Sequence, residues 1–414
     1  MIKINNDYQL LYVFAVCIIP ISLLISSGVS EAIVIIISTY FFLNFRYVKK
    51  KIHNNFYFYL LLILWFYLIL NYFTSLNSNL SFLRNILFFK YIAYVFTLFL
   101  LLEKKTFFNR IFLVWLITTL IVTFDIFFEY FNGKNILGFE SYDPSRIASF
   151  LGKELKIAHF LFGFSFISLG YFIDKFNKKR FNYHEASILL LITLFTAAIV
   201  MTGERANTIR FIIGIVIFIT LLSKQFFKYK KIILSLVLAI FFSLYIFSAK
   251  LKERSDTILL PLKENGFLNY LKKTQHGAHY YTALEIFKKY PWLGIGNKNF
   301  REECSNNNYY NKDYLYTDQR CATHPHQIYF ELLSEHGLLG STVILSIIFY
   351  SIFKGIKTYR RDKNTIHLGS IVFIATQFLP IVPSGSFFTS WGATIFWTNF
   401  AILIFYNCKA KNAY

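Results

Sequence analysis

Two histidines in one short segment carry the clearest sign of chemistry in this sequence. His324 and His326 belong to residues 324–327 (His-Pro-His-Gln), and nine residues separate this segment from Gly337 and Gly340. The intervening proline favours an extended backbone before it, so we expect His326 near the start of a helix whose glycines permit close helix packing. An imidazole suits proton abstraction from a hydroxyl at neutral pH. This setting favours a functional His326, whereas a solvated loop residue is the simpler interpretation of His324 alone.

Three arginines form a second candidate group. Arg205 lies in a tight polar turn, Arg146 in another connection between apolar runs, and Arg301 in the longest polar segment. A guanidinium fork matches phosphate oxygens and stays charged when partly desolvated. Next to lipid, such cations suggest binding of a lipid-linked diphosphate. The alternative is a structural role, either snorkelling or a salt bridge such as Arg205 with Glu204.

The composition shows what kind of element must position these residues. Of 414 residues, 56% are hydrophobic and only 16% are charged, whereas roughly a quarter are charged in soluble domains. Disorder, a collagen-like fibre and a disulfide-dense mini-domain are excluded. The net charge of +21 invites a nucleic-acid partner, but a basic patch needs a soluble domain to carry it. Because none is evident, we expect no nucleic-acid partner.

Long apolar runs recur along the whole chain and predict an all-α, polytopic membrane protein. Each run is long enough to cross a hydrocarbon core of about 30 Å as a helix. The first follows a single Lys3 without a small-residue cleavage site, which favours a retained signal-anchor. The twelve expected spans are 8–26, 29–45, 56–75, 86–102, 110–130, 157–174, 186–202, 207–223, 231–249, 337–353, 366–382 and 389–407.

The positions of Lys and Arg predict the orientation of these spans. With the N-terminus inside, 23 of the 43 cations fall on the cytoplasmic side and 7 in the short outer connections. Another 12 lie in residues 250–336, a loop long enough to be exempt from the positive-inside rule. We therefore expect spans one to nine in residues 1–249, an outer loop over 250–336, and spans ten to twelve with a short cytoplasmic tail in 337–414. Much of the net charge of +21 therefore reflects the orientation of the spans in the membrane and does not indicate a ligand.

The outer loop is the main place for structure outside the membrane. Residues 276–290 have helical spacing of apolar residues and end at Pro291, whereas residues 304–323 are polar and predict an irregular loop. The loop fits a cap packed on the helices better than an independent domain. Cys304 and Cys321 both lie in it, and an oxidising compartment favours a disulfide over two free thiols. Such a bond would fix the segment just before His324.

Ionisable residues inside the apolar runs carry a weaker signal. Asp125 and Glu129 are one helical turn apart and must face protein or water rather than lipid. Lys90, on another span, could pair with either of them. Structural pairing and a cavity-lining role both remain open. Residues 380–388, which contain two prolines and Gly385, are expected to contribute to a cavity wall.

Several motifs for nucleotide, redox or metal chemistry are absent from the sequence. The sequence contains no Walker A loop, no glycine-rich dinucleotide loop, no CxxC pair and no HExxH motif. The outer loop offers no carboxylate cluster of the kind a cation-dependent glycosyltransferase uses. We therefore expect neither ATP, nor a metal ion, nor another cofactor.

With these residues in view, the chain resembles the O-antigen ligase and O-antigen polymerase superfamily of bacterial envelope glycosyltransferases. The resemblance rests on His326 and Gln327 with the two glycines after them, on the long loop before them, and on Arg205. Residues 290–296 (Tyr-Pro-Trp-Leu-Gly-Ile-Gly), ahead of Phe300 and Arg301, also match. The resemblance to this superfamily covers spans five to twelve, whereas the first four spans match only in hydropathy.

This resemblance implies a reaction at the periplasmic face of the bacterial inner membrane. The donor would be a glycan on undecaprenyl diphosphate, and the acceptor a sugar hydroxyl, on lipid A core in true ligases. His326 would be the base and Arg205 would bind the diphosphate. The other residues expected to bind the diphosphate or the glycan are Arg146, Arg301, His324, Gln327 and His279. Many members have an arginine where this chain has His276 and His279, so Arg301 or Arg254 is the expected replacement.

Other functions remain open at this stage. An O-antigen polymerase or a protein O-oligosaccharyltransferase would use the same donor with a different acceptor. A transporter or flippase is a rival from another class. Transporters usually show repeated halves and helices broken at mid-membrane, whereas the polar residues here gather at the outer surface. The sequence therefore favours a ligase-like glycosyltransferase over transport.

Overall fold

The computed structural model describes residues 6–177, 184–222, 230–247 and 266–409, together with the isolated positions 252, 256, 262 and 263. Helices make up 78% of the structure, and the described residues form no strand. The predicted all-α class is therefore confirmed.

The bundle consists of long apolar helices joined by short turns, with a few single helical turns between them. In chain order the helices are α1 (Asn6–Cys17), α2 (Ile19–Ile25), α3 (Ser27–Leu43), α4 (Phe45–Ile52), α5 (Phe56–Phe73), α6 (Ser78–Asn85), η1 (Ile86–Phe88), α7 (Phe89–Leu102), α8 (Lys105–Asn132), η2 (Ser149–Leu151), α9 (Ile157–Asn177), α10 (His184–Met201), α11 (Arg205–Leu221), α12 (Lys230–Phe247), α14 (Gln275–Lys289), α15 (Phe300–Glu303), η3 (Asn307–Tyr309), η4 (Thr317–Gln319), α16 (Ile328–Asp362), α17 (Thr365–Gln377) and α18 (Ser390–Lys409).

Several of these helices have the length and composition of membrane spans. Within the described residues, five continuous helices qualify, or up to seven if each of two bent pairs is one span. The bent pairs are α1 with α2, at 52°, and α3 with α4, at 84°. Each of the twelve predicted apolar runs overlaps a helix. The chain is a polytopic membrane protein, while the number of twelve crossings stays a prediction.

Helix α9 forms the centre of the bundle and packs against α8, α10, α11, α17 and α18. Its contact with α17 depends on two glycines. A Cβ added at Gly170 would lie 2.3 Å from the carbonyl oxygen of Thr365, and one added at Gly369 would lie 2.3 Å from that of Phe166. Small residues therefore allow these two backbones to approach closely, as is common between membrane helices.

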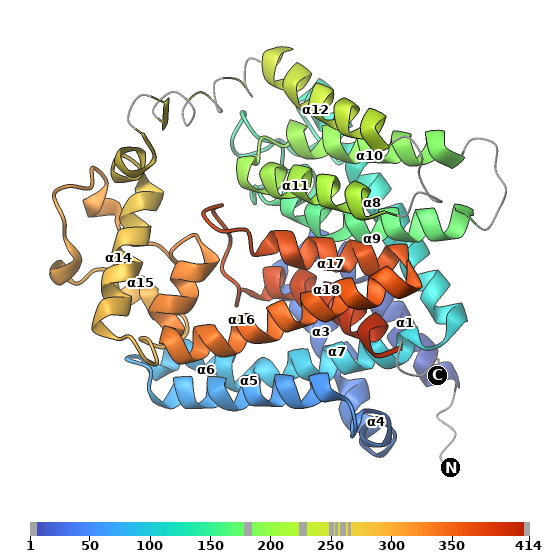
Figure 1. Cartoon of the computed structure of the whole chain (residues 1–414), viewed down its shortest axis with the longest axis horizontal. Helices are drawn as coiled ribbons and strands as arrows, with labels where there is room; N and C mark the ends of the chain where they lie inside the picture. Colours follow the sequence, from blue (N-terminus) through green and yellow to red (C-terminus); the bar gives the residue numbers. More distant parts are fainter. Residues whose placement is uncertain are drawn as a thin grey trace.

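The two ends of the bundle differ. Figure 1 shows α5, α9, α10, α11 and α16 running roughly side by side along the long axis, with α14 and α15 at one end and both chain termini at the other. The expected helix over 276–290 is confirmed as α14. It packs against α16, and only the short turns η3 and η4 interrupt the irregular segment after it.

Helix α16 starts where the sequence predicted but differs from the expectation in the role of its first glycine. It begins at Ile328, two residues after His326, and is kinked at Gly337, with φ 61° and ψ −165°. At the kink its backbone pairs with residues 291–296: Leu338 N–H donates to Pro291 O at 2.7 Å, and Ile295 N–H donates to Ser334 O at 3.0 Å. The prediction of helix packing at Gly337 is thus wrong, because the glycine admits a loop backbone instead.

The second glycine behaves as expected. A Cβ added at Gly340 would lie 2.1 Å from the hydroxyl oxygen of Tyr67 on α5. That hydroxyl donates to His336 O at 2.8 Å. Gly340 therefore permits the close packing of α16 on α5 that the sequence predicted.

Intramembrane charges make structural pairs. Asp125 and Glu129 are buried and accept hydrogen bonds from the connection after α8, Asp125 from Ile136 N–H at 2.8 Å and Glu129 from Ser149 N–H at 2.7 Å. Lys90 pairs with Glu31, so the expected pairing with Asp125 or Glu129 is wrong. The physical reason is that α3 packs on α7 and brings Glu31 to the lysine.

Candidate active site

Four histidines gather at the end of the bundle that carries α14. His276 and His279 lie on α14, and His324 and His326 lie just before α16. The ring centroid of His326 is 5.4 Å from that of His276, 5.2 Å from that of His279 and 4.2 Å from that of His324. We call these four side chains the histidine cluster. Among the described residues, no group of three or more His, Cys, Asp or Glu is arranged to hold a metal ion.

The backbone of His326 is held in an uncommon conformation. Its φ is 60°, in the left-handed region that non-glycine residues rarely adopt. Ser384 N–H donates to His326 O at 2.7 Å, and His324 Nε2 donates to Ser384 O at 3.2 Å, since a carbonyl can only accept. The two histidines are therefore clamped by the segment 380–388, which the sequence predicted as a cavity wall.

A buried cation and a buried carboxylate fix that segment in turn. The Arg210 guanidinium donates to Val382 O at 3.2 Å and to Pro383 O at 2.8 Å. Glu331 accepts hydrogen bonds from Ser386 Oγ at 2.5 Å and from Phe387 N–H at 3.0 Å. This network links α11 and α16 to the segment that clamps His326.

Lys298, from the long loop, completes the network. Its ammonium donates to Ser386 Oγ and lies 3.9 Å from Glu331 Oε1. The lysine is only 6% exposed and its carboxylate partner is fully buried. Burial lowers the pKa of Lys298, although the Glu331 carboxylate opposes this.

Gln327 acts first as a helix cap. Its Oε1 accepts hydrogen bonds from Tyr329 N–H at 2.8 Å and Phe330 N–H at 3.2 Å. A side chain in this position satisfies backbone donors that the first turn leaves without partners. The amide predicted to bind substrate therefore also orients α16 directly after His326.

His279 is held by the disulfide-bearing segment. Its Nε2 donates to Gln319 O at 3.1 Å, and Cys304 is joined to Cys321 in a disulfide. Because Nε2 carries the proton, Nδ1 is left as an acceptor, and this buried atom has no hydrogen-bond partner among the described residues. His279 thus presents a lone pair inside the histidine cluster.

The cluster is predominantly neutral at neutral pH. Burial, followed by the charges of His326 and Arg205, lowers the pKa of His276 to about 4. Burial and the two neighbouring imidazoles lower the pKa of His279 to about 4, and burial lowers that of His324 to about 3. Burial also lowers the pKa of His326. A neutral imidazole is the form that can accept a proton.

The three predicted arginines are placed differently. Arg205 begins α11 and is exposed, and its charge helps to lower the pKa of His276. Arg146 donates to Leu155 O at 2.5 Å and lies 3.9 Å from Glu204, the residue before Arg205. Arg301 is exposed on α15 and its charge acts on Lys298. The described contacts do not bring Arg301 to the cluster, and Arg254 lies outside the described residues.

An aromatic groove of about 390 Å³ adjoins the cluster. The rings of Tyr280 and Phe330 stack at 4.7 Å in its wall, and those of Tyr281 and Tyr314 stack at 4.6 Å. Gln327, next to His326, also lines it. We call this hollow the aromatic groove; its walls suit an apolar chain or the faces of sugar rings.

Some residues of the site were missed by the sequence analysis as functional candidates. Lys298, Glu331 and Arg210 hold the segment beside His326, yet they are far apart in sequence and belong to no motif. Only a general rule pointed to them, namely that an ionisable residue in an apolar run needs a buried partner. His276 was noted only as a departure from the family pattern, whereas its ring lies beside that of His326.

Fold and site together define a polytopic membrane protein with neutral imidazoles and a guanidinium gathered at one end of its helical bundle. Residues 188–345 match the family described as O-Antigen ligase. The matched region includes Arg205, the long loop, His326, Gly337 and Gly340. This match supports the O-antigen ligase and polymerase superfamily and implies a glycosyltransferase-like enzyme. No curated protein matches the chain.

Proposed function

We propose that the protein transfers a glycan from undecaprenyl diphosphate to a sugar hydroxyl of an acceptor, lipid A core in the ligase reaction. The reaction takes place at the periplasmic face of a bacterial inner membrane and uses neither ATP nor a metal ion. One observation carries the proposal: four imidazoles gather at the end of the bundle that holds α14, and the charge of Arg205 acts on one of them, His276. The family match adds the class of reaction and the lipid-linked donor.

His326 acts as the base in this reaction. Its imidazole takes the proton of the acceptor hydroxyl while the hydroxyl oxygen bonds to the anomeric carbon of the donor sugar. The bond from that carbon to the diphosphate oxygen breaks, and its electron pair leaves on undecaprenyl diphosphate. General-base catalysis of this kind contributes typically 10²- to 10⁴-fold to the rate.

Arg205 stabilises the charge on the leaving diphosphate. Its exposed guanidinium, at the start of α11, can donate several hydrogen bonds to phosphate oxygens. Arg146 lies 3.9 Å from Glu204, the residue before Arg205, and supports the position of Arg205 through it. Arg301 binds the glycan or diphosphate from the loop. Fixed cations aimed at developing charge are usually a large part of such catalysis.

The remaining predicted residues bind or position the substrate. His279 accepts a hydrogen bond from a substrate hydroxyl at Nδ1, the buried acceptor that has no partner among the described residues. His324 and Gln327 hold His326 in place through Ser384 and through the start of α16. The aromatic groove receives sugar rings next to the base.

Transfer by the purified protein tests the proposal. The protein is incubated in detergent with lipid-linked glycan and lipid A core, in EDTA and without ATP, and the released undecaprenyl diphosphate is measured. Parallel reactions with a second lipid-linked glycan, or with an acceptor protein, distinguish polymerase and protein-glycosylation activity from ligation.

Matched variants separate the site from the rest of the protein. We expect His326→Ala and Arg205→Ala to lose transfer. Arg46→Ala, in the first turn of α4, and His53→Ala, directly after its last residue, change exposed residues and should retain transfer. Full activity of His326→Ala would contradict the mechanism, and a requirement for ATP would contradict the class of reaction.

A further inference from the structure

A second cavity lies far from the histidine cluster, between the beginning of α8 and the end of α9. Its volume is about 320 Å³. Two cations line it, Arg110 from α8 and Lys175 from α9, together with the apolar side chains of Leu113, Leu116 and Phe172. We call it the α8–α9 pocket. It combines a positively charged mouth with an apolar interior.

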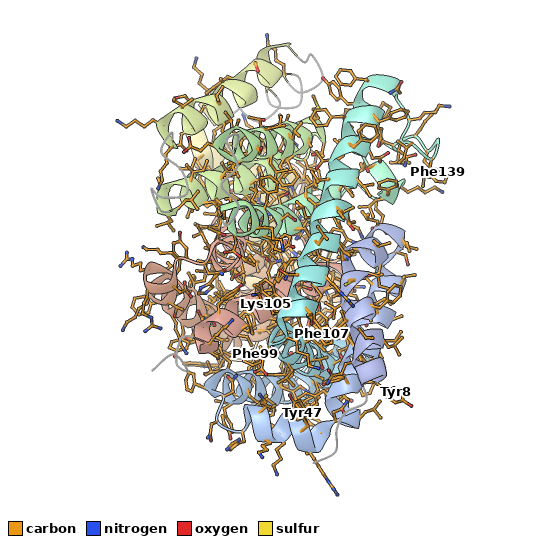
Figure 2. The ribbon with its side chains drawn as sticks, turned by 90° about the vertical axis from the view of Figure 1, so that its right-hand side faces the viewer. Tyr8, Tyr47, Phe99, Lys105, Phe107 and Phe139 are labelled. Carbon is orange, nitrogen blue, oxygen red and sulfur yellow. A yellow bond between two sulfur atoms is a disulfide. The ribbon has the colours of Figure 1, made fainter. Side chains whose placement is uncertain are left out.

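The α8–α9 pocket belongs to the end of the molecule that carries the chain termini. Helix α9 ends on that side in Figure 1, opposite α14 and α15. Figure 2 views the same end and shows α8 passing across it, with Lys105 and Phe107 in its first turn. The distribution of Lys and Arg in the sequence assigns this end to the cytoplasmic surface of the membrane.

The two walls of the pocket are fixed to each other. Tyr171 on α9 donates its hydroxyl to Asn109 O on α8 at 3.3 Å. The ring of the same tyrosine stacks on that of Phe112, with centroids 5.9 Å apart. Among the described residues that line the pocket, none is acidic. These contacts fix the two walls, and the charged side chains of the lining itself, Arg110 and Lys175, favour an anion.

An apolar stripe on α8 continues from the pocket into the hydrophobic part of the bundle. Leu113 is 47% exposed, Ile117 47%, Ile121 48% and Phe124 62%. Steps of three or four residues put these side chains on one face of a helix. In a membrane protein such a face lies against acyl chains, and here it begins at Leu113, which also lines the pocket.

We propose that the α8–α9 pocket binds one anionic phospholipid. The headgroup phosphate lies between Arg110 and Lys175, and an acyl chain follows Leu113 and Ile117 along α8. Basic pockets between membrane helices on the cytoplasmic side are suited to anionic headgroups. Inorganic phosphate cannot use the apolar stripe, and a zwitterionic lipid offers the two cations no net charge.

Native mass spectrometry of the purified full-length protein tests this site. The protein is titrated with phosphatidylglycerol, with phosphatidylcholine of the same acyl chains, and with inorganic phosphate. Each cation near an anionic headgroup contributes about 1 kcal/mol, so Arg110→Gln combined with Lys175→Gln should weaken phosphatidylglycerol binding about 30-fold. Lys49→Gln combined with Lys50→Gln removes the same charge from exposed positions of α4 at the same end and should leave binding unchanged.

Three results would overturn the proposal. The first is wild-type affinity for phosphatidylglycerol in the Arg110→Gln, Lys175→Gln protein. The second is equal affinity of the wild-type protein for phosphatidylcholine, which would mean that the cations do not select the lipid. The third is displacement of the lipid by an equimolar amount of inorganic phosphate, which would make the pocket a phosphate site.

Discussion

Replacement of Gly337 by alanine tests the backbone contact that joins α16 to the long loop. The glycine has φ 61° and ψ −165°, a region that is almost restricted to glycine and costs other residues about 1–3 kcal/mol. An added Cβ would also lie 2.5 Å from the carbonyl carbon and oxygen of Trp292. Because both atoms belong to the backbone, relief requires the loop to move, at a further cost of about 1–3 kcal/mol. We expect a total loss of about 2–6 kcal/mol.

Two other glycines separate these contributions. Gly133 has φ 77° and ψ −8° with no atom within 4 Å of an added Cβ, so Gly133→Ala should cost about 1–2 kcal/mol from the backbone alone. Gly385 has open space and no positive φ, so Gly385→Ala should be neutral or stabilise the protein by about 0.4–1 kcal/mol. Thermal unfolding in detergent, followed by tryptophan fluorescence, ranks the three variants. If Gly337→Ala and Gly133→Ala have the same melting temperature, the close contact with Trp292 does not exist.

Three further predictions follow from the site. Glu331→Gln leaves Lys298 as a buried unpaired charge and should cost about 3–5 kcal/mol in unfolding experiments, whereas Glu103→Gln, in an exposed pair with Lys51, should cost at most about 1 kcal/mol. The folded state lowers the pKa of His279 to about 4 and that of His324 to about 3, so the unfolded chain binds more protons below about pH 6.5. The melting temperature should therefore fall as the pH decreases from about 6.5 to about 3, and a flat profile would contradict the lowered pKa. Reduction should change the electrophoretic mobility of the wild-type protein but not of Cys304→Ser.

Much of the fold could be predicted because helix formation in a membrane leaves a local signal. Each apolar run is readable from a few neighbouring residues, and each overlaps a helix of the structure. The start of α16 was predicted from Pro325 beside His326 and not from hydropathy, because residues 328–336 are helical without being uniformly apolar. Local hydropathy does not report where a helix begins outside the membrane.

The site was predicted in part for a related reason. His326 could be singled out because its own neighbours mark the start of a helix. Its ring contacts with His276 and His279 could not be foreseen, since they depend on how α14 packs against α16. The same holds for Lys90, whose partner Glu31 lies on another helix, and for the pairing of Lys298 with Glu331. Contacts between residues that are far apart in the chain produce no regular residue spacing from which they could be predicted.

The measurement that tests the central claim most directly is the rate of a single turnover. Lipid-linked glycan is bound to wild-type protein, to His326→Ala and to His53→Ala, acceptor is added in excess, and the release of undecaprenyl diphosphate is followed. If His326 is the base, release should slow by about 10²- to 10⁴-fold in His326→Ala, with donor binding unchanged and His53→Ala equal to wild type. Release at the wild-type rate in His326→Ala would contradict the account.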